Sequence, residues 1–456
     1  MGTLFGTDGV RGLANADLTP ELALSLGRAA VGVLRAQAEA GPGPTGPGSR
    51  PAVVVGRDPR ASGVLLESAL VAGILSAGGD VLAAGVVPTP AVAFLTRHYG
   101  AAAGAVISAS HNAMPDNGIK LFGPEGFKLP DAVEVRIEAA VAAPDHGAPR
   151  PVGAEVGGLR PTADDAVEAY LAHLLEGIPD LDGLEVVVDC ANGAAAECAP
   201  EAYRRAGAKV TAVAADPDGH NINDGVGSTH PEHVKDALAR TGAQVGLAHD
   251  GDADRLLAVD EQGRLVDGDV ILAICALDAR DRGGLPTNTV VTTVMTNLGF
   301  KKAMAEHGIA VVQTAVGDRY VLEAMLAGGH HVGGEQSGHL IFLDRATTGD
   351  GLLTGLRLLG VVAGSGKPLS QLARVIRRLP QVLVNVAVAD RDALDGAAAV
   401  WHAVAEEEGR LGDSGRVLVR PSGTEALVRV MVEAETEEAA RTTADRLAAV
   451  VTAELG

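Results

Sequence analysis

One order of predicted elements occurs three times along this chain and limits the folds open to it. Each copy starts with a valine-rich strand that ends in a polar or glycine-containing loop; these strands lie at residues 53–55, 186–188 and 290–291. A helical pattern follows, stops at a glycine and leads into a second strand. Buried strands that alternate with helices form mostly parallel sheets with helices on their faces. The repeat therefore predicts three α/β domains with mixed, mostly parallel sheets.

The pattern changes near residue 378. Alternating apolar residues predict a strand over residues 382–388, a helix follows near Trp401, and two strands flank residues 420–425. This order predicts a smaller α+β domain at the C-terminal end. At about 100–200 residues per domain, 456 residues accommodate four domains. The predicted boundaries give domains of residues 1–160, 161–262, 263–377 and 378–456.

Each repeat also contains a later strand that runs into a strongly polar loop. These loops are residues 108–112 (SASHN), 249–255 (HDGDADR) and 333–339 (GGEQSGH). Open α/β sheets bind ligands beyond the carboxyl ends of their strands. We therefore expect the three loops to face one shared central cleft, which the C-terminal domain closes.

The second loop has the composition of a magnesium site. Asp250, Asp252 and Asp254 alternate along it, and hard carboxylate oxygens are the ligands that Mg²⁺ prefers. A calcium EF-hand is excluded because Arg255 stands where the sharp turn needs glycine and because a strand pattern follows. Arg255 is itself a candidate catalytic residue whose guanidinium could bind a phosphate oxygen, and a structural ion pair is the alternative.

Ser110 in the first loop is the candidate nucleophile. A serine in this place could also form a local turn between its hydroxyl and the backbone. The metal loop and Lys120, ten residues further along, favour the reactive interpretation. A serine hydroxyl transfers a phosphoryl group only if the transferring charge is neutralised and the proton is handled, and Mg²⁺ and Lys120 could supply these two functions.

The third loop offers groups that suit a sugar. Glu335 and Ser337 place a carboxylate and a hydroxyl among glycines, where a backbone can approach closely, and a turn with a helix cap is the alternative. His339 could relay a proton or make a structural hydrogen bond.

The C-terminal domain contains the residue types of a phosphate-binding nest. One loop between two strands supplies a guanidinium, two hydroxyls and free backbone N–H groups, and a plain hairpin turn is the alternative. The candidate phosphate-binding residues are Arg420, Ser422, Gly423, Thr424 and Arg429.

The composition argues against some classes of partner. A formal net charge of −21 disfavours a protein that binds nucleic acid or an anionic membrane, because such surfaces are bound mainly through clustered Lys and Arg. The N-terminus has no basic start followed by an apolar run, and no stretch reaches the roughly 18 apolar residues of a membrane span. Three scattered cysteines are expected to be reduced. We expect a cytoplasmic protein with a phosphosugar partner, and a homodimer is compatible with the sequence.

A set of motifs runs through essentially the whole chain in a fixed order: residues 4–12 (LFGTDGVRG), 108–112, 250–255, 334–339 (GEQSGH) and 420–424 (RPSGT). With these motifs the chain resembles the α-D-phosphohexomutases. The resemblance implies a heart-shaped enzyme of four domains around a central cleft. It also implies that Ser110 carries the phosphate as phosphoserine and joins the three aspartates in binding one Mg²⁺.

The resemblance assigns further roles. Arg11 and Lys120 would assist the transfer, and Glu335 and Ser337 would bind sugar hydroxyls. The distal phosphate would be bound by Arg420, Ser422, Gly423 and Thr424. Two positions depart from the family pattern: Ala113 stands where proline is usual, and His249 stands where an aromatic or aliphatic residue is commoner.

The implied reaction is the isomerisation of glucosamine 6-phosphate to glucosamine 1-phosphate through glucosamine 1,6-bisphosphate. Its product would feed the synthesis of UDP-N-acetylglucosamine and hence of peptidoglycan. Gln336 and the GTDGVRG opening favour this substrate over the hexose phosphates of related members. The alternatives are a phosphomannomutase or phosphoglucomutase with the same mechanism, a catalytically silent phosphosugar-binding protein, and a metal-dependent phosphatase that uses Asp250 as nucleophile.

Overall fold

The computed structural model describes residues 4–6, 8–40, 50–143, 148, 150–422 and 426–456 of the chain. The chain divides into two compact units, residues 1–294 with 312–374 and residues 295–311 with 375–456. None of the helices in these described ranges has the length and apolar character needed to cross a membrane.

The N-terminal sheet of the first unit is built from β1 (Val10–Leu13), β2 (Ala52–Arg57), β3 (Asp80–Val86), β4 (Ala103–Ile107), β5 (Asp116–Phe122) and β6 (Leu159–Pro161). The strand order is β1-β5-β4-β2-β3-β6. Strands β4, β2, β3 and β6 are parallel, whereas β5 is antiparallel to both of its neighbours.

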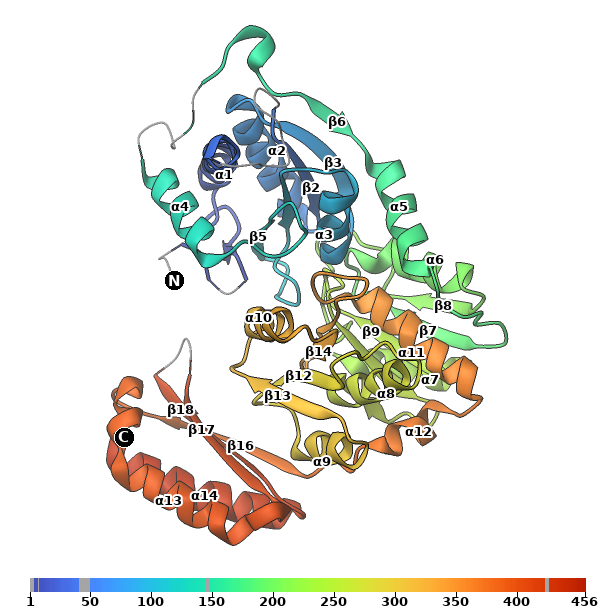
Figure 1. Cartoon of the computed structure of the whole chain (residues 1–456), viewed down its shortest axis with the longest axis vertical. Helices are drawn as coiled ribbons and strands as arrows, with labels where there is room; N and C mark the ends of the chain where they lie inside the picture. Colours follow the sequence, from blue (N-terminus) through green and yellow to red (C-terminus); the bar gives the residue numbers. More distant parts are fainter. Residues whose placement is uncertain (1–3, 7, 41–49, 144–147, 149, 423–425) are drawn as a thin grey trace. The chain divides into compact units, whose positions relative to one another are not determined.

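Helices cover both faces of this sheet because side chains alternate between the faces of each strand. Val53 and Val55 join a buried apolar cluster with α1 (Pro20–Ala40), α2 (Ala61–Ser76) and α4 (Asp131–Ala142). On the other face, α3 (Thr89–His98) packs so closely on β2 that a Cβ on Gly56 would lie 2.7 Å from Val92. Figure 1 shows α1 and α3 on opposite sides of the sheet.

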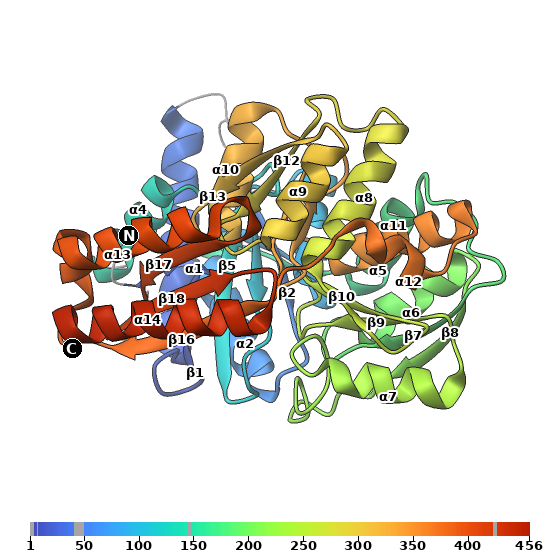
Figure 2. The same ribbon diagram turned by 90° about the horizontal axis from the view of Figure 1, so that it is seen from below.

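The second sheet of this unit contains β7 (Glu185–Asp189), β8 (Lys209–Val213), β9 (Val245–His249), β10 (Leu256–Asp260) and β11 (Leu265–Val266). In the order β11-β10-β9-β7-β8, β7 is parallel to β8 and β9, and β10 is antiparallel to β9 and β11. Helix α7 (Pro231–Thr241) covers one face, and α6 (Ala195–Arg205) with α5 (Ala163–Leu175) lies on the other side (Figure 2).

The third sheet consists of β12 (Thr289–Thr293), β13 (Ala310–Thr314), β14 (Val332–Gly334) and β15 (Leu340–Phe342), in the order β13-β12-β14-β15. Strands β12 and β14 are parallel, and β14 and β15 are antiparallel. The accompanying helices of the first unit are α8 (Gly268–Asp281), α10 (Asp318–Gly328), α11 (Gly351–Ser365) and α12 (Leu369–Leu372). Val321 and Met325 of α10 pack against Val291 and Ile341 of the sheet.

The second unit has an antiparallel sheet of β16 (Gln381–Ala387), β18 (Leu427–Glu433) and β17 (Arg416–Pro421), in that spatial order. Helices α13 (Ala398–Leu411) and α14 (Glu437–Leu455) lie side by side along one face of it (Figures 1 and 2). Helix α9 (Leu298–Glu306) also belongs to this unit. Short 3₁₀ helices span Gly153–Glu155, Ala373–Val375, Arg391–Gly396 and Gly412–Ser414.

The predicted fold class is confirmed: three α/β domains with mixed sheets precede a smaller α+β domain. The structure adds one regularity. Each of the three polar loops connects a central strand to an antiparallel neighbour, from β4 to β5, from β9 to β10 and from β14 to β15. The loops therefore occupy the same position in the three sheets, at the carboxyl end of a central strand.

Candidate active site

Ser110 lies in the first of these loops, with its side chain against the second. Its Oγ donates a hydrogen bond of 2.6 Å to Asp250 Oδ2. The three aspartates of the second loop, Asp250, Asp252 and Asp254, are buried, and one ligand oxygen from each lies within 4.8 Å of the others. The structure therefore brings a hydroxyl and three carboxylates together from positions 140 residues apart in sequence.

The electrostatics of this cluster fit a divalent cation. Asp252 Oδ1 and Asp254 Oδ1 are buried and have no hydrogen-bond partner among the described residues. Burial and the neighbouring carboxylates of Asp254 and Asp252 raise the pKa of Asp250 well above its usual value. Hard oxygens with unsatisfied negative charge are the ligand set that Mg²⁺ takes. The residues present therefore suit Mg²⁺.

Lys120 brings a positive charge to the same cluster. Its Nζ lies 2.7 Å from Asp252 Oδ2 and 3.5 Å from Asp254 Oδ2, and the side chain is almost fully buried. Burial alone would lower the pKa of Lys120, but the two carboxylates raise it above the usual value. Lys120 is therefore an ammonium ion at neutral pH. Thr89 Oγ1 donates a 2.6 Å hydrogen bond to the same Asp252 oxygen and fixes its orientation.

Two arginines lie at the edge of the cluster. Arg255 Nε is 3.7 Å from Asp254 Oδ1, and the Arg255 backbone N–H donates to Asp250 Oδ1. Arg11 Nη2 lies 3.4 Å from Asp8, and strand β1 places Arg11 opposite Gly118, two residues before Lys120. Arg255 therefore lies beside the carboxylates, and Arg11 lies on the strand paired with the one that carries Lys120, so both can contribute positive charge for a phosphate.

His111 follows Ser110, and its Nδ1 lies 3.2 Å from Ser110 Oγ. Burial, with further contributions from Arg255 and Arg11, lowers the pKa of His111 to about 4. Its imidazole is therefore neutral at pH 7 and can exchange a hydrogen bond with the hydroxyl.

The third loop holds Glu335 and Ser337 next to each other. Glu335 accepts a hydrogen bond from the Gly317 backbone N–H at 3.1 Å and one from Ser337 Oγ at 3.4 Å. The Leu256 backbone N–H donates to the Gly338 carbonyl, which ties this loop to the strand that follows the aspartates. Gln336 points elsewhere, because its amide donates to Asp267, the N-cap residue of α8.

His339 lies between the metal loop and α10. Its Nε2 is 3.7 Å from Asp318 Oδ2 and 4.0 Å from Asp254 Oδ2, and within the described ranges neither ring nitrogen makes a hydrogen bond. The side chain is almost completely buried. A buried imidazole without a fixed partner favours the proton-relay interpretation over a structural hydrogen bond.

The predicted phosphate nest lies in the second unit. Arg420 and Arg429 are directly opposite each other on β17 and β18, and burial together with Arg429 lowers the pKa of Arg420. Ser422 Oγ is buried and has no hydrogen-bond partner in the part of the chain that the structure describes. Two facing guanidinium groups favour binding of an anion between them. Gly423 and Thr424 lie outside the described residues.

Sequence reasoning did not identify four side chains that hold this site in place. Asp58, Arg60 and Asn223 contact the Ser110 loop, and Thr89 contacts Asp252. Asp58 follows a strand end that the repeat already marked, so its position was a usable signal. Asn223 lies in a long loop without periodicity, and no sequence signal indicated its role.

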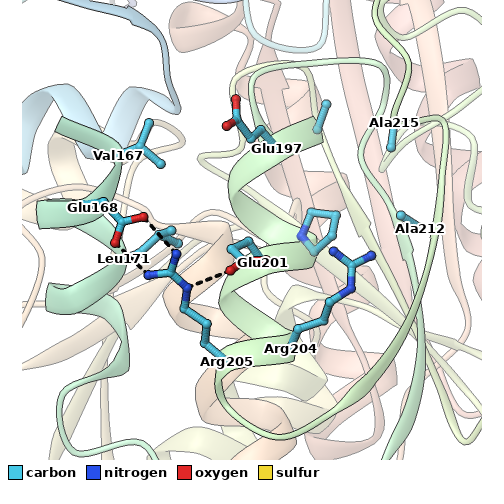
Figure 3. Close-up of a pocket in the computed structure, with 11 residues that line it drawn as sticks. Val167, Glu168, Leu171, Glu197, Glu201, Arg204, Arg205, Ala212 and Ala215 are labelled. Carbon is cyan, nitrogen blue, oxygen red and sulfur yellow. Dashed lines mark hydrogen bonds and ion pairs between the residues drawn. The ribbon is translucent and has the colours of Figure 1, made fainter. Parts of the chain in front are cut away.

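A separate surface pocket of about 470 Å³ lies between α5, α6 and β8 (Figure 3). The guanidinium group of Arg205 in this pocket binds the carboxylates of Glu168 and Glu201. Glu197 and Arg204 also line the pocket. Three carboxylates and two guanidinium groups leave a net negative charge, which disfavours a sugar phosphate. None of the predicted site residues lines this pocket.

Four family models match the chain in order. They are the three alpha/beta/alpha domains and the C-terminal domain of phosphoglucomutase/phosphomannomutase, and they match residues 2–147, 168–263, 267–379 and 383–450.

Relatives that match over the full length carry one name. The chain is 59% identical to the phosphoglucosamine mutase of Streptomyces griseus, with 100% of both chains covered. It is 58% identical to that of Rhodococcus jostii, with 99% of each covered.

Solved structures share the fold. A phosphoglucomutase/phosphomannomutase family protein from Burkholderia thailandensis matches with a TM-score of 0.82 at 25% identity, covering 100% of this chain and 98% of that one. An N-acetylphosphoglucosamine mutase from Aspergillus fumigatus, in complex with GlcNAc-6P and magnesium, matches in fold with a TM-score of 0.66 at 19% identity, covering 100% and 96%.

Proposed function

Because the chain belongs to the phosphoglucomutase/phosphomannomutase family, we propose that it is an isomerase that converts glucosamine 6-phosphate to glucosamine 1-phosphate. Full-length relatives at 58–59% identity support the glucosamine substrate. One structural observation supports the chemistry most directly: Ser110 Oγ points at the carboxylate of Asp250 within the group of three buried aspartates.

In this proposal Ser110 is the phosphoryl carrier. The phosphoserine P–O bond breaks as O1 of glucosamine 6-phosphate forms its own bond to phosphorus, which leaves Ser110 as a hydroxyl and gives glucosamine 1,6-bisphosphate. The bisphosphate turns end over end. Its 6-phosphoryl group then passes to Ser110, and glucosamine 1-phosphate leaves. In the first transfer the O1 hydroxyl loses its proton and Ser110 Oγ gains one. In the second, Ser110 Oγ loses a proton and O6 gains one.

The other groups of the site would orient the transferring phosphoryl group and neutralise its negative charge. Mg²⁺, bound by Asp250, Asp252, Asp254 and a Ser110 oxygen, would supply electrostatic stabilisation of the transferring phosphoryl group. Lys120, paired with Asp252, would stabilise the same developing negative charge.

Cationic and polar groups further out would bind the substrate. Arg11 and Arg255 would attract phosphate oxygens, and His339 would relay a proton. The Glu335 carboxylate would accept hydrogen bonds from sugar hydroxyls, and the Ser337 hydroxyl would donate one to them. The phosphate that is not reacting would be bound by Arg420, Ser422, Gly423, Thr424 and Arg429.

The proposal has consequences for the whole chain. It divides the chain into domains after residues 160, 262 and 377. It places the enzyme in the cytoplasm, in keeping with Cys190, Cys198 and Cys275, which are all free thiols. The partner is the phosphosugar, and glucosamine 1,6-bisphosphate would also act as activator by phosphorylating Ser110.

The test is turnover of purified protein with Mg²⁺ and a trace of sugar 1,6-bisphosphate. We expect glucosamine 6-phosphate to be converted faster than glucose 6-phosphate or mannose 6-phosphate, and Ser110→Ala to lose turnover while its circular dichroism stays unchanged. Faster turnover of glucose 6-phosphate or mannose 6-phosphate would show that the substrate is a hexose phosphate and not glucosamine 6-phosphate. Retained activity in Ser110→Ala would remove Ser110 from the mechanism.

Intact-mass analysis followed by peptide mapping distinguishes a mutase from a phosphatase and from a silent binding protein. The proposal expects one phosphate on Ser110 after incubation with the bisphosphate. Phosphate on Asp250 together with release of inorganic phosphate would indicate a phosphatase. Binding of the sugar phosphate without any turnover or phosphorylation would indicate a silent binding protein.

A further inference from the structure

We propose that Arg60 and Asn223 are positioning residues for phosphoryl transfer, because they hold the backbone of Ser110 in the conformation that directs its hydroxyl to the metal-binding carboxylates. This inference rests on the proposed function of Ser110 as phosphoryl carrier.

The backbone of Ser110 adopts a conformation that needs support. Its φ is +51°, in the left-handed region that non-glycine residues seldom occupy. This conformation is strained for an L-residue and persists when its surroundings fix it. Both backbone polar groups of Ser110 are bound. The N–H donates to Ser108 Oγ at 3.0 Å, and the carbonyl accepts from Arg60 Nη2 at 3.0 Å and from Asn223 Nδ2 at 2.9 Å.

Arg60 binds three successive parts of the loop at once. Besides the Ser110 carbonyl, Nη2 donates to the Asn112 carbonyl at 2.8 Å and Nη1 donates to the Ala113 carbonyl at 2.5 Å. The guanidinium is fully buried and its Nε donates to Asp58 at 2.9 Å. A buried, anchored fork of this kind fixes the loop more firmly than a single donor can.

Asp58 closes the network. Its Oδ2 accepts a 2.6 Å hydrogen bond from Ser108 Oγ, the same hydroxyl that accepts from the Ser110 N–H. The loop after β2 therefore fixes both sides of the Ser110 peptide through one ion pair, Asp58 with Arg60.

Asn223 supplies the second support, from the loop between β8 and α7 of the domain that carries the aspartates. Its Nδ2 also donates to the Asn112 carbonyl at 3.1 Å, and its own N–H donates to the Ala191 carbonyl at 2.9 Å. Gly251, between the metal-binding aspartates, leaves room for the Ser110 carbonyl, since a Cβ there would lie 2.6 Å from that oxygen. The serine loop and the metal loop are therefore fixed to each other through the backbone of Ser110.

The same contacts hold position 113, where alanine stands in place of the proline usual in the family. A proline ring would restrict the loop by fixing φ. In this chain Ala113 is fixed through its carbonyl, which Arg60 binds. The Arg60 guanidinium binds carbonyl oxygens of the loop and the carboxylate of Asp58. It therefore positions the Ser110 hydroxyl by fixing the backbone.

The experiment compares Arg60→Lys and Asn223→Gly with the wild-type enzyme, each with Mg²⁺ and glucosamine 6-phosphate. Lysine keeps the charge beside Asp58 but cannot bind three carbonyls, and glycine tolerates the φ of +58° at position 223 while removing the donor. We expect kcat to fall by about 10- to 100-fold in each variant, because small misplacement of a reacting group has this effect, while KM changes by less than about threefold. Phosphorylation of Ser110 by the sugar 1,6-bisphosphate, followed by intact mass, should slow in parallel.

Arg28→Lys is the matched control. Arg28 is also buried in the N-terminal domain and also binds a hydroxyl and a carbonyl, of Ser76 and Ala148, away from the serine loop. We expect its kcat to stay within about twofold of wild type even if its thermal stability falls. An equal fall of kcat in Arg28→Lys would indicate that Arg60 only stabilises the fold and does not position Ser110. If Arg60→Lys does not fold, Asn223→Gly decides, and an unchanged kcat in that variant would overturn the proposal.

Hydrogen exchange separates this inference from the proposed function. Backbone amides of residues 108–113 should exchange faster in Arg60→Lys and Asn223→Gly than in wild type or Arg28→Lys. Faster exchange combined with an active Ser110→Ala variant would refute the role of Ser110 and leave the support of the loop standing. Unchanged exchange, with Ser110→Ala inactive, would refute the positioning role alone.

Discussion

Asp252 is the residue on which most contacts of the carboxylate cluster meet. Lys120 and Thr89 both bind its Oδ2, while its Oδ1 is buried and has no hydrogen-bond partner in the described part of the chain. Lys120 and then Thr89 hold the pKa of Asp252 below its usual value against the effect of burial. Lys120 and Thr89 therefore favour the anionic form of Asp252, which a hard cation requires.

Asp252→Asn should weaken metal binding and turnover together. The amide is neutral, so one of three negative charges is lost, and ligand charge is a main determinant of affinity for a hard cation. We expect the Mg²⁺ concentration for half-maximal activity to rise by about 10-fold or more, a change that titration calorimetry with Mg²⁺ can check. Asp260→Asn is the control, because Asp260 is equally buried in the same sheet but pairs with Arg264. An unchanged Mg²⁺ requirement in Asp252→Asn would contradict the assigned metal site.

The sequence predicted these reacting groups better than it predicted their supports. Alternating aspartates and a serine beyond a strand are local patterns with direct chemical meaning, so Ser110 and Asp252 could be found. Arg60 and Asn223 act on carbonyls 50 and 113 residues away. No local pattern encodes a hydrogen bond to a distant backbone oxygen, because its formation depends on how two sheets pack.

At the level of secondary structure, the connection between a central strand and its antiparallel neighbour determines where the site forms. The valine-rich strands were predictable because they are buried on both faces and lack polar alternation. The antiparallel direction of β5, β10 and β15 could not be predicted from the sequence, because the residue pattern of a short strand does not show how it runs relative to its neighbours. Their hairpin-like return brings Lys120 of β5 back toward the end of β4 that carries Ser110.

Helix α11 begins at a carboxylate whose protonation should affect stability. Asp350 is its N-cap, accepts a hydrogen bond from the Leu353 N–H and binds the Tyr170 hydroxyl, both at 2.9 Å. Burial, partly offset by these hydrogen bonds, raises the pKa of Asp350 from its ordinary 3.8 to about 6. The folded state therefore binds a proton more tightly than the unfolded state, so the free energy of unfolding falls as pH rises between these two values.

Asp350→Asn should remove this pH dependence. Asparagine is a good N-cap and stays neutral, so the variant should gain stability relative to wild type as pH rises from 4 to 7, by at most about 3 kcal/mol. Urea unfolding of both proteins in EDTA, at pH 4.5 and pH 7, gives the difference. Asp281→Asn, at an exposed carboxylate, is the control and should show no such trend. A difference between Asp350→Asn and wild type that does not change with pH would contradict the raised pKa.

At the scale of the whole molecule, the order of the chain and the order of its compact units differ. The chain leaves the first unit after Val294, forms α9 in the second unit and returns at Val312. Buried Glu433 of β18 binds the start of α9 within the second unit. It accepts from the Leu298 N–H at 2.8 Å, from the Asn297 amide and from Arg416. The repeat pattern assigns this helix to the third α/β domain, and the family model of that domain, which matches residues 267–379, also includes it.

Two units with separate candidate sites should show separable defects. The candidate metal ligands all lie in the first unit, and the candidate phosphate-binding residues Arg420, Ser422 and Arg429 lie in the second. Arg420→Met removes one of two facing guanidinium groups and so the charge-assisted hydrogen bonds to the phosphate that is not reacting. Loss of such a bond costs about 1.5–3 kcal/mol, so we expect KM for glucosamine 6-phosphate to rise by about 10- to 100-fold.

The Mg²⁺ requirement of Arg420→Met should stay at the wild-type value. Asp252→Asn should instead raise the Mg²⁺ requirement and leave KM for glucosamine 6-phosphate near the wild-type value. Arg446→Met serves as control in the same unit, because the half-exposed Arg446 pairs with the buried Glu407 of α13 and not with Arg420 or Arg429. Initial rates over a grid of substrate and Mg²⁺ concentrations measure both parameters in one experiment. If Arg420→Met raised the Mg²⁺ requirement and left KM unchanged, the phosphate would have to be bound elsewhere, and the division of tasks between the units would be wrong.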